Sequence, residues 1–281
     1  MIPKLVKLQN AGGVGNSGRI VEALPTSGIF YDLMLVCRDA GGVLLTEAEI
    51  EADVTNIRLR LNGELKIETT AAVLFDIFRY WNAWAGSYTI AGQIPIQFTR
   101  PHALTALERL AMAWGMQGVS GWAIEIDLAA VLAKLATIEI FAHVQDGVLP
   151  LGKHICIQKN ERIFGSTGVH QVTDLDRNNS DRSVLVEHIG VGSGTIGSVT
   201  AKINQQDMVQ DNDTDLNNIR LHLAGRTPQT GWYHLDYTIL NDHLSILPLA
   251  QVNSLQYDIN FLTQPDNFII YREEVRGLKK A

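Results

Sequence analysis

One unit of this sequence occurs twice, and the distance between its copies restricts the chain to two domains of one type. The first copy runs from Val54 to Phe78, and a weaker second copy runs from Gly197 to Leu221. Asn204 in the second copy follows Asn62 in the first by 142 residues. Solenoid repeats recur every ~20 to 50 residues. The longer spacing therefore indicates a tandem duplication of whole domains.

A β-hairpin is expected at the start of the first copy, because apolar and charged residues alternate on both sides of Asn62-Gly63. A two-residue turn at this dipeptide would put the two apolar sets on opposite faces of the sheet. We therefore predict a three-residue loop, Leu61-Asn62-Gly63, with Gly63 at a positive φ. This loop pairs Leu59 with Leu65, Ile57 with Ile67 and Arg60 with Glu64, and it leaves Arg58 facing Lys66.

A helix is expected after the hairpin in each copy. Apolar residues recur at three- and four-residue steps from Val73 to Trp84, with Thr69 or Thr70 as the N-cap and Gly86 as the stop. In the second copy the predicted N-cap is Asp213. The repeated unit is therefore a hairpin followed by a helix.

The remaining sequence predicts strands in a similar order in the two halves, separated by Gly-rich turns. In the first half they cover 20–24, 29–37, 94–99, 121–128 and 137–144, with a helix over 103–116. In the second half they cover 155–163, 184–191, 232–240, 255–262 and 268–273. Many strands and few helices indicate an all-β fold class built from β-sandwich domains. We place an N-terminal arm at 1–18, one domain at 19–147 and a second at 148–281.

The composition is that of an ordinary globular protein, with 46% hydrophobic and 19% charged residues over 281 positions. Cys37 and Cys156 lie in separate apolar runs and do not make a disulfide framework. No apolar run reaches the ~20 residues that span a bilayer, and residues 1–18 lack the pattern of a signal peptide. We expect a soluble product that is synthesised in a cytoplasm.

Two groups of residues were tested as metal sites. Asp211, Asp213 and Asp215 match the opening of a calcium loop, but Leu216 and His222 stand where that loop requires Gly and Glu. Capping of the following helix explains these carboxylates, and a weak divalent-cation site, with calcium as the ion, is the alternative.

His234 and Asp236 have the His-x-Asp spacing of a metal oxygenase, but only His243 follows closely as a third ligand. We therefore interpret His234 and Asp236 as residues at a strand rim. The sequence predicts no catalytic residues and no cofactor, so the protein is not expected to be an enzyme.

Basic residues are concentrated at the two ends of the chain. Lys4, Lys7 and Arg19 lie in residues 1–19, and Arg276, Lys279 and Lys280 lie in residues 276–281, with no acid in either segment. The remaining 17 basic and 30 acidic residues give the body a net charge of −13. An anionic surface attracts basic segments and repels an acidic body. We therefore expect these six residues to face an anionic surface; the alternative is that the basic ends only aid solubility.

Three segments carry a resemblance to a known family: NIRLRLNGEL at 56–65, IQFTRP at 96–101 followed by a helix, and GVSGWAIEIDLA at 118–129. In this order they resemble the double jelly-roll major capsid proteins of tailless, membrane-containing phages, of the corticovirus type. The similarity covers about residues 18–277. It implies two tandem jelly rolls with short inserted helices, and a chain that functions in the virion capsid.

The resemblance also implies partners. Three chains would form a homotrimer, a pseudo-hexameric capsomer that tiles an icosahedral shell over a membrane and genome. Neighbouring capsomers, a vertex (penton) protein and internal membrane lipids would contact it, and no sequence-specific nucleic-acid binding is implied. The anionic surface faced by the six basic residues would then be the internal lipid headgroups or the genome.

A jelly-roll carbohydrate-binding or cupin-like protein is the alternative function. In such a protein, tryptophans would line a sugar groove. Trp81, Trp84 and Trp114 instead fall on predicted helical core stripes, which favours the capsid protein.

Overall fold

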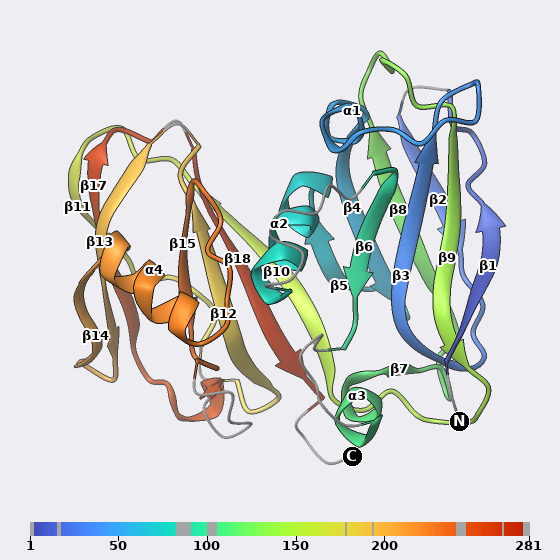
Figure 1. Cartoon of the computed structure of the whole chain (residues 1–281). Helices are drawn as coiled ribbons and strands as arrows, with labels where there is room; N and C mark the ends of the chain where they lie inside the picture. The colour runs from blue at the N-terminus through green and yellow to red at the C-terminus, as the bar shows by residue number, and fades with distance from the viewer. Residues whose placement is uncertain are drawn as a thin grey trace. The chain divides into compact units, whose positions relative to one another are not determined.

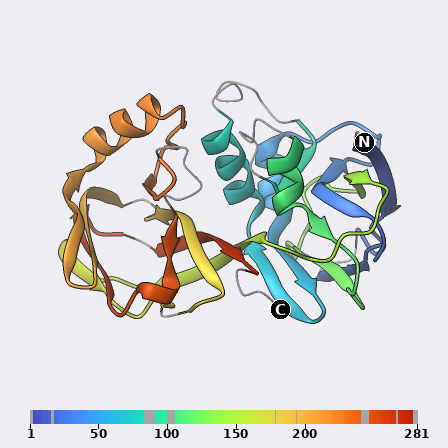
Figure 2. The same cartoon turned by 90° about the horizontal axis from the view of Figure 1, so that it is seen from below.

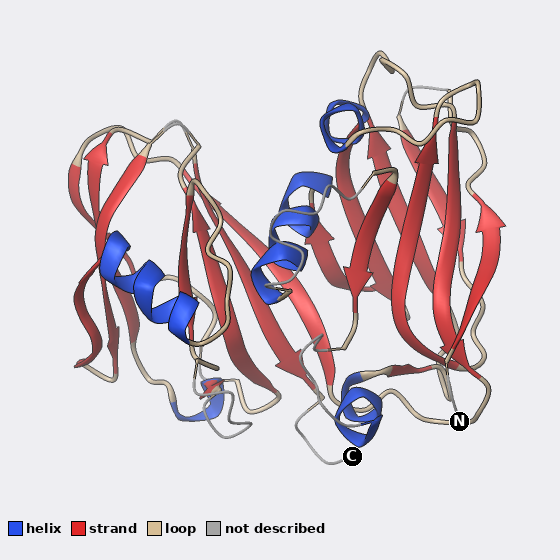
Figure 3. Cartoon of the chain, in the orientation of Figure 1, coloured by secondary structure: helices blue, strands red, loops and turns tan. Residues whose placement is uncertain are grey.

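The computed structural model describes residues 3–15, 18–82, 91–99, 106–177, 179–192, 194–239, 246–265 and 267–277. Within these ranges strands predominate over helices, as the alternating apolar pattern predicts (Figure 3). The chain divides into two compact units, Met1–Cys156 and Ile157–Ala281. The sequence placed the junction earlier, between 147 and 148, in the connection between β9 (Thr137–Gln145) and β10 (His154–Arg162).

The first unit contributes four principal strands to each of two antiparallel sheets (Figure 1). Its strands are β1 (Lys4–Asn10), β2 (Arg19–Ala23), β3 (Ile29–Arg38), β4 (Val54–Leu61), β5 (Glu64–Thr69), β6 (Gln93–Gln97), β7 (Trp114–Gly115), β8 (Trp122–Leu128) and β9 (Thr137–Gln145). One sheet has the order β1-β9-β3-β6, with β7 also paired to β3, and the other has the order β5-β4-β8-β2.

The second unit repeats this arrangement. Its strands are β10 (His154–Arg162), β11 (Gly168–Val172), β12 (Arg182–Gly190), β13 (Thr195–Ile203), β14 (Gln206–Asp213), β15 (Trp232–Asp236), β16 (Leu247–Pro248), β17 (Leu255–Thr263) and β18 (Phe268–Arg276). In one sheet these strands have the order β10-β18-β12-β15, with β16 also paired to β12. In the other sheet the order is β14-β13-β17-β11. Each strand of the first unit has a counterpart at the same place in the second. The predicted duplication and the double jelly-roll fold class are confirmed.

Four α-helices are described, α1 (Glu47–Asp53), α2 (Ala71–Trp81), α3 (Ala106–Met112) and α4 (Thr214–Leu223), and a short 3-10 helix, η2 (Leu249–Gln251). The hairpin β4–β5 leads into α2, and the hairpin β13–β14 leads into α4, as predicted. Thr70 caps α2 by accepting a hydrogen bond from the Val73 amide, 3.3 Å. Asp213 caps α4 in the same way through the Leu216 amide, 2.9 Å. Figure 2 shows α4 on the outside of the strand layers of its unit.

Aromatic residues fill the core of the first unit. Phe98 stacks on Trp114 with ring centroids 4.2 Å apart, and Trp122 packs against both. Trp114, predicted on a helix, lies instead in β7, because α3 ends at Met112. It is nevertheless fully buried, as is most of Trp81. These tryptophans are therefore unavailable to line a sugar groove, and Trp84 and Gly86 lie outside the described residues.

The expected N-terminal arm is partly a strand. Lys4–Asn10 forms β1, which pairs antiparallel with β9 from Lys4 opposite Val144 to Asn10 opposite Glu139. Its alternation is weak because Lys4 and Lys7 interrupt the apolar residues, so a strand is poorly indicated by the sequence. By its place in the sheet, β1 is the counterpart of β10.

The predicted three-residue loop of the first hairpin is wrong. Leu61 pairs with Glu64, so the turn has two residues, Asn62 at φ 51° and Gly63 at φ 80°. A β-bulge after Leu59 allows this two-residue turn and still places Leu59 and Ile67 on the same face of the sheet. Leu59 pairs with Ile67, while Arg60 pairs with Leu65. Lys66 is the extra residue of the bulge.

The bulge also changes the charge pairs of the hairpin. Arg58 faces Glu68 rather than Lys66, and its Nε donates to the Glu68 carboxylate at 2.9 Å. Arg60 donates instead to Glu125 on β8, at 2.7 Å. The positive φ predicted for Gly63 is confirmed.

Equivalent asparagines hold the hairpin turns of the two units. The Asn62 side-chain oxygen accepts hydrogen bonds from the amides of Ser120 and Gly121, 2.8 and 3.3 Å, just before β8. The Asn204 side-chain oxygen accepts from the amides of Asn253 and Ser254, 2.7 and 3.3 Å, just before β17. The duplicated sequence therefore encodes a duplicated clamp between the turn and the next strand of the sheet.

One difference between these turns predicts a stabilising substitution. Gln205 occupies the place of Gly63 and has φ 66°, a conformation that costs a residue with a Cβ about 1 kcal/mol. Gln205→Gly should raise the free energy of unfolding by roughly 0.5 to 1 kcal/mol, measured by thermal denaturation. The matched change Gly63→Val should lower it by about 1 kcal/mol or more. If both variants melt at the wild-type temperature, backbone strain at these positions is not significant.

Candidate functional site

The acidic residues at the start of α4 are used in helix capping. Asp213 is the N-cap, and Asp215 lies in the first helical turn, where a negative charge is favourable. The side chain of Asp211 lies outside the described residues. Among the residues that the structure describes, no group of three His, Cys, Asp or Glu side chains could hold a metal ion. The weak cation site includes Asp211 and therefore stays a prediction.

The six terminal basic residues do not form one described basic surface. Lys4 pairs with Asp146 at 3.1 Å, Lys7 pairs with Glu139, and Arg19 pairs with Asp127 at 2.6 Å. Their charges are thus partly balanced by neighbouring strands.

Arg276 differs from the expectation, because it is buried at the end of β18 and its Nε donates to Glu274 at 3.2 Å. In the chain as described, Arg276 cannot reach a lipid surface. Lys279 and Lys280 lie outside the described residues.

His234 and Asp236 are both buried, rather than exposed at a strand rim. The Asp236 carboxylate accepts from Arg226 Nε at 3.0 Å and from the amide and hydroxyl of Thr238 at 2.6 and 2.7 Å. These donors account for both carboxylate oxygens, as an internal structural role requires. His243, the suggested third ligand, lies outside the described residues.

A chain of hydrogen bonds runs through two buried histidines of the second unit. The Gln229 amide donates to Nε2 of His234 at 3.2 Å, so the proton of a neutral His234 is on Nδ1. That proton faces Nδ1 of His188, 2.7 Å away, and Nε2 of His188 donates to Glu273 at 2.7 Å. The sequence pattern identified His234 but gave no sign of His188 or Glu273, which lie on strands β12 and β18.

This arrangement predicts how stability depends on pH. Burial, and then repulsion from His188, hold the pKa of His234 well below its ordinary value of 6.5. The unfolded chain therefore binds a proton as the pH falls below 6.5, while folded His234 does not. Stability should decrease on acidification from this pH, with a slope from His234 of at most about 1.4 kcal/mol per pH unit.

The measurement is the free energy of unfolding of wild type and His234→Gln between pH 7.5 and 5. The slope, rather than the absolute stability, is compared, because the variant also loses buried hydrogen bonds. A smaller slope is expected in the variant. Equal slopes in the two proteins, or a wild type that becomes more stable on acidification, would contradict the buried neutral histidine.

A second buried polar group in this unit is ionic. Arg272 on β18 contacts the Glu187 carboxylate on β12 through Nε at 2.7 Å and Nη2 at 2.6 Å. Its Nη1 donates to the Asp176 carbonyl at 2.8 Å. Glu274 lies between Arg272 and Arg276, 3.8 and 3.2 Å away. Buried charges that are paired in this way order the strand pair but form no cleft for a substrate.

The cysteines of the two units lie in the core. Cys37 and Cys156 are buried thiols, and desolvation raises the pKa of the Cys37 thiol to about 12. A thiol of this kind is inert at neutral pH. No helix within the described ranges is long and apolar enough to cross a membrane.

Comparisons with known proteins agree with this structural role. The model of the viral coat protein P2 N-terminal domain matches residues 5–145, and that of the P2 C-terminal domain matches residues 157–278. No curated protein sequence matches the chain.

Three solved structures share the fold along nearly the whole chain. The major capsid protein P2 of bacteriophage PM2 has a TM-score of 0.82 at 18% identity and covers 99% of both chains. The STIV major capsid protein has a TM-score of 0.69 at 11% identity, with 98% of this chain and 96% of that chain covered. The PBCV-1 virus capsid has a TM-score of 0.66 at 9% identity, with 98% of this chain and 95% of that chain covered.

The two family models together span both jelly rolls, and the first alone covers half of the sequence. The buried polar groups described above serve the fold, and the family is one of structural coat proteins rather than enzymes. The chain therefore belongs to the viral coat protein P2 family and is a double jelly-roll major capsid protein of the virion.

Proposed function

We propose that three copies of this chain associate into a homotrimer, and that this trimer is the capsomer of an icosahedral shell. Three chains of two domains bring six similar jelly rolls together. Six such domains can occupy a near-hexagonal outline while the closed symmetry remains threefold. A separate vertex protein is then needed where five capsomers meet.

The observation that carries this proposal is the equivalence of the two units. The sheet orders agree strand for strand, and even the two-residue strands β7 and β16 pair with equivalent strands, β3 and β12. The asparagine clamps of the two hairpins also agree. A shell that packs near-hexagonal units benefits from this likeness, because each lattice neighbour meets nearly the same domain.

The mass of the purified protein in solution tests the trimer. Sedimentation velocity at micromolar to millimolar concentration should show a species of three times the 31.0 kDa of one chain. The trimer should persist on dilution through much of this range. A protein that remains monomeric at every concentration would overturn the proposal.

We include an internal membrane in this proposal, with Lys279 and Lys280 as the residues that contact lipid headgroups. Each lysine near an anionic bilayer contributes roughly 1 kcal/mol. Lys279→Ser/Lys280→Ser should therefore reduce co-sedimentation with phosphatidylserine vesicles by roughly tenfold or more. The control Lys153→Ser/Arg177→Ser removes the same charge from exposed positions elsewhere. Equal losses in the two variants, or binding that salt does not weaken, would exclude a specific contact by the C-terminal lysines.

A further inference from the structure

Helix α4 exposes an apolar face. Leu216, Ile219 and Leu223 are 61%, 57% and 86% exposed, and their spacing places them on one stripe of the helix. The opposite side of α4 packs on its own unit through Leu221 and Asn217, which are fully buried. An apolar stripe of this kind on a soluble domain marks an interaction surface.

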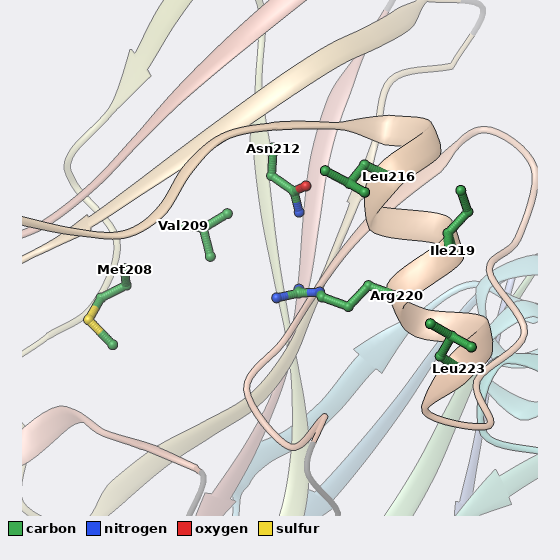
Figure 4. Close-up of a pocket in the computed structure, with 7 residues that line it drawn as sticks. All are labelled: Met208, Val209, Asn212, Leu216, Ile219, Arg220 and Leu223. Atoms are coloured by element: carbon green, nitrogen blue, oxygen red, sulfur yellow. The ribbon is translucent and has the colours of Figure 1, made fainter.

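A groove lies between this stripe and strand β14. Met208 and Val209 of β14 form the other wall, and Arg220 lies between the walls (Figure 4). Arg220 Nη2 donates to Asn217 at 3.1 Å, but its Nε is buried and has no hydrogen-bond partner among the described residues. A buried donor without an acceptor is unfavourable. We use the name α4–β14 groove for the surface that consists of Met208, Val209, Asn212 and the exposed side chains of α4.

The duplicated helix shows that this face is suited to burial. Leu74, Ile77 and Trp81 of α2 precede Leu216, Ile219 and Leu223 by the same 142 residues that separate the two clamp asparagines. In the first unit these three side chains are only 3%, 8% and 6% exposed. Helices α2 and α4 have the same place in the same topology. The apolar face of α4 is therefore exposed where that of its counterpart is buried, and it is open to a covering element.

Strand β1 has the properties of such an element. It is the edge strand of the order β1-β9-β3-β6 and exposes Leu5 and Val6. Edge strands present unpaired backbone groups to other chains. Strand β14 is likewise an edge strand, at the end of the order β11-β17-β13-β14.

The two edge strands have opposite charges. Strand β1 contains Lys4 and Lys7 and no acid, whereas β14 contains Asp207, Asp211 and Asp213 and no basic residue. The Lys4–Asp146 pair is largely exposed, so it contributes little and can rearrange. The basic N-terminal strand and the acidic residues before α4, both noted in the sequence, are thus complementary.

We propose that β1 of one copy of this chain docks at the α4–β14 groove of the next copy. The inference rests on the proposed trimer and specifies its contact. Each chain offers one β1 and one groove, so the contacts run head to tail, and three of them close a ring. Leu5 covers the apolar stripe, and the lysines of β1 lie near the acidic residues of β14.

Cysteine cross-linking tests the contact directly. The double variant Leu5→Cys/Met208→Cys is oxidised and run on a non-reducing gel, where covalent dimers and trimers are expected. Cys37 and Cys156 are buried and give little background. The control Leu5→Cys/Val169→Cys places the second thiol on β11, the opposite edge strand of the same sheet, where Val169 is as exposed as Met208, 65% against 63%. Equal cross-linking in both variants, or a disulfide only within monomers, would overturn the inference.

A second variant separates this inference from the proposed function. Leu216→Gln/Ile219→Gln/Leu223→Gln should weaken trimer association roughly tenfold or more, because it removes apolar area from the interface. The control Val131→Gln/Ile163→Gln/Val169→Gln changes three equally exposed apolar residues elsewhere and should leave association unchanged. A wild type that does not associate contradicts the trimer itself. A wild-type trimer that the α4 variant leaves intact contradicts only the assignment of the groove.

Discussion

Arg272→Met should lower the free energy of unfolding by about 3 to 5 kcal/mol, because it leaves the buried Glu187 carboxylate without its cation. Both side chains are almost fully inaccessible, and two guanidinium nitrogens lie within 2.7 Å of one Glu187 oxygen. The Asp176 carbonyl loses its donor as well. Denaturant unfolding at one fixed protein concentration measures the change.

Two further variants identify the cause of this loss. Glu187→Met/Arg272→Met has no uncompensated charge and should be more stable than Arg272→Met alone. Lys4→Met breaks an ion pair whose side chains are 72% and 79% exposed and should change stability by less than about 1 kcal/mol. If the double variant is less stable than Arg272→Met, the loss reflects packing rather than an unpaired charge.

The second large effect is expected at Asp53, the last residue of α1. Its buried carboxylate accepts hydrogen bonds from the amides of Ala133, Lys134 and Leu135 at 2.6, 2.9 and 2.8 Å. It thereby fixes the segment that enters β9. Asp53→Ala removes all three acceptor contacts and should lower the free energy of unfolding by about 3 kcal/mol.

Asp39 provides the matched control for this substitution. Its carboxylate accepts from the amides of Gly41 and Val43 at 2.9 and 2.8 Å, but in an exposed turn where water can replace it. Asp39→Ala should change stability by about 1 kcal/mol or less. Similar losses at the two positions would show that burial of the Asp53 contacts is not the cause.

The features that the sequence predicted well are those with a local signal. Thr70 and Asp213 cap helices because the acceptor and the amide it binds are three residues apart, so a short stretch of sequence contains both partners. Gly63 has a positive φ because a tight turn requires it. The repeated hairpin and helix were recognisable because the same local signals occur twice.

The features that were missed depend on residues distant in the sequence. The bulge at Leu59 could not be predicted from the alternation of apolar and polar residues. The predicted pairing assumed that every residue of one strand faces one residue of the other, and the bulge breaks this rule. Strand β1 is defined by its pairing with β9, about 130 residues away. Arg276 looked like part of a basic tail, but it lies at the end of β18 beside Glu274.

The candidate sites show the same contrast. Asp213 was correctly interpreted as a cap, since its partner is local. His188, His234 and Glu273 come from three strands, so only the sheet order brings them together. The α4–β14 groove could not be predicted either. The apolar residues of α2 and α4 have the same spacing, and only the structure shows that the apolar face of α2 is buried and that of α4 is exposed.

Electron microscopy of the purified oligomer tests the central claim most directly, namely that this chain supplies two of six jelly rolls in a threefold capsomer. Averaged views down the symmetry axis should show six densities in a near-hexagonal ring with threefold symmetry. Views of isolated two-lobed particles, or a ring with a number of densities other than six, would contradict the account.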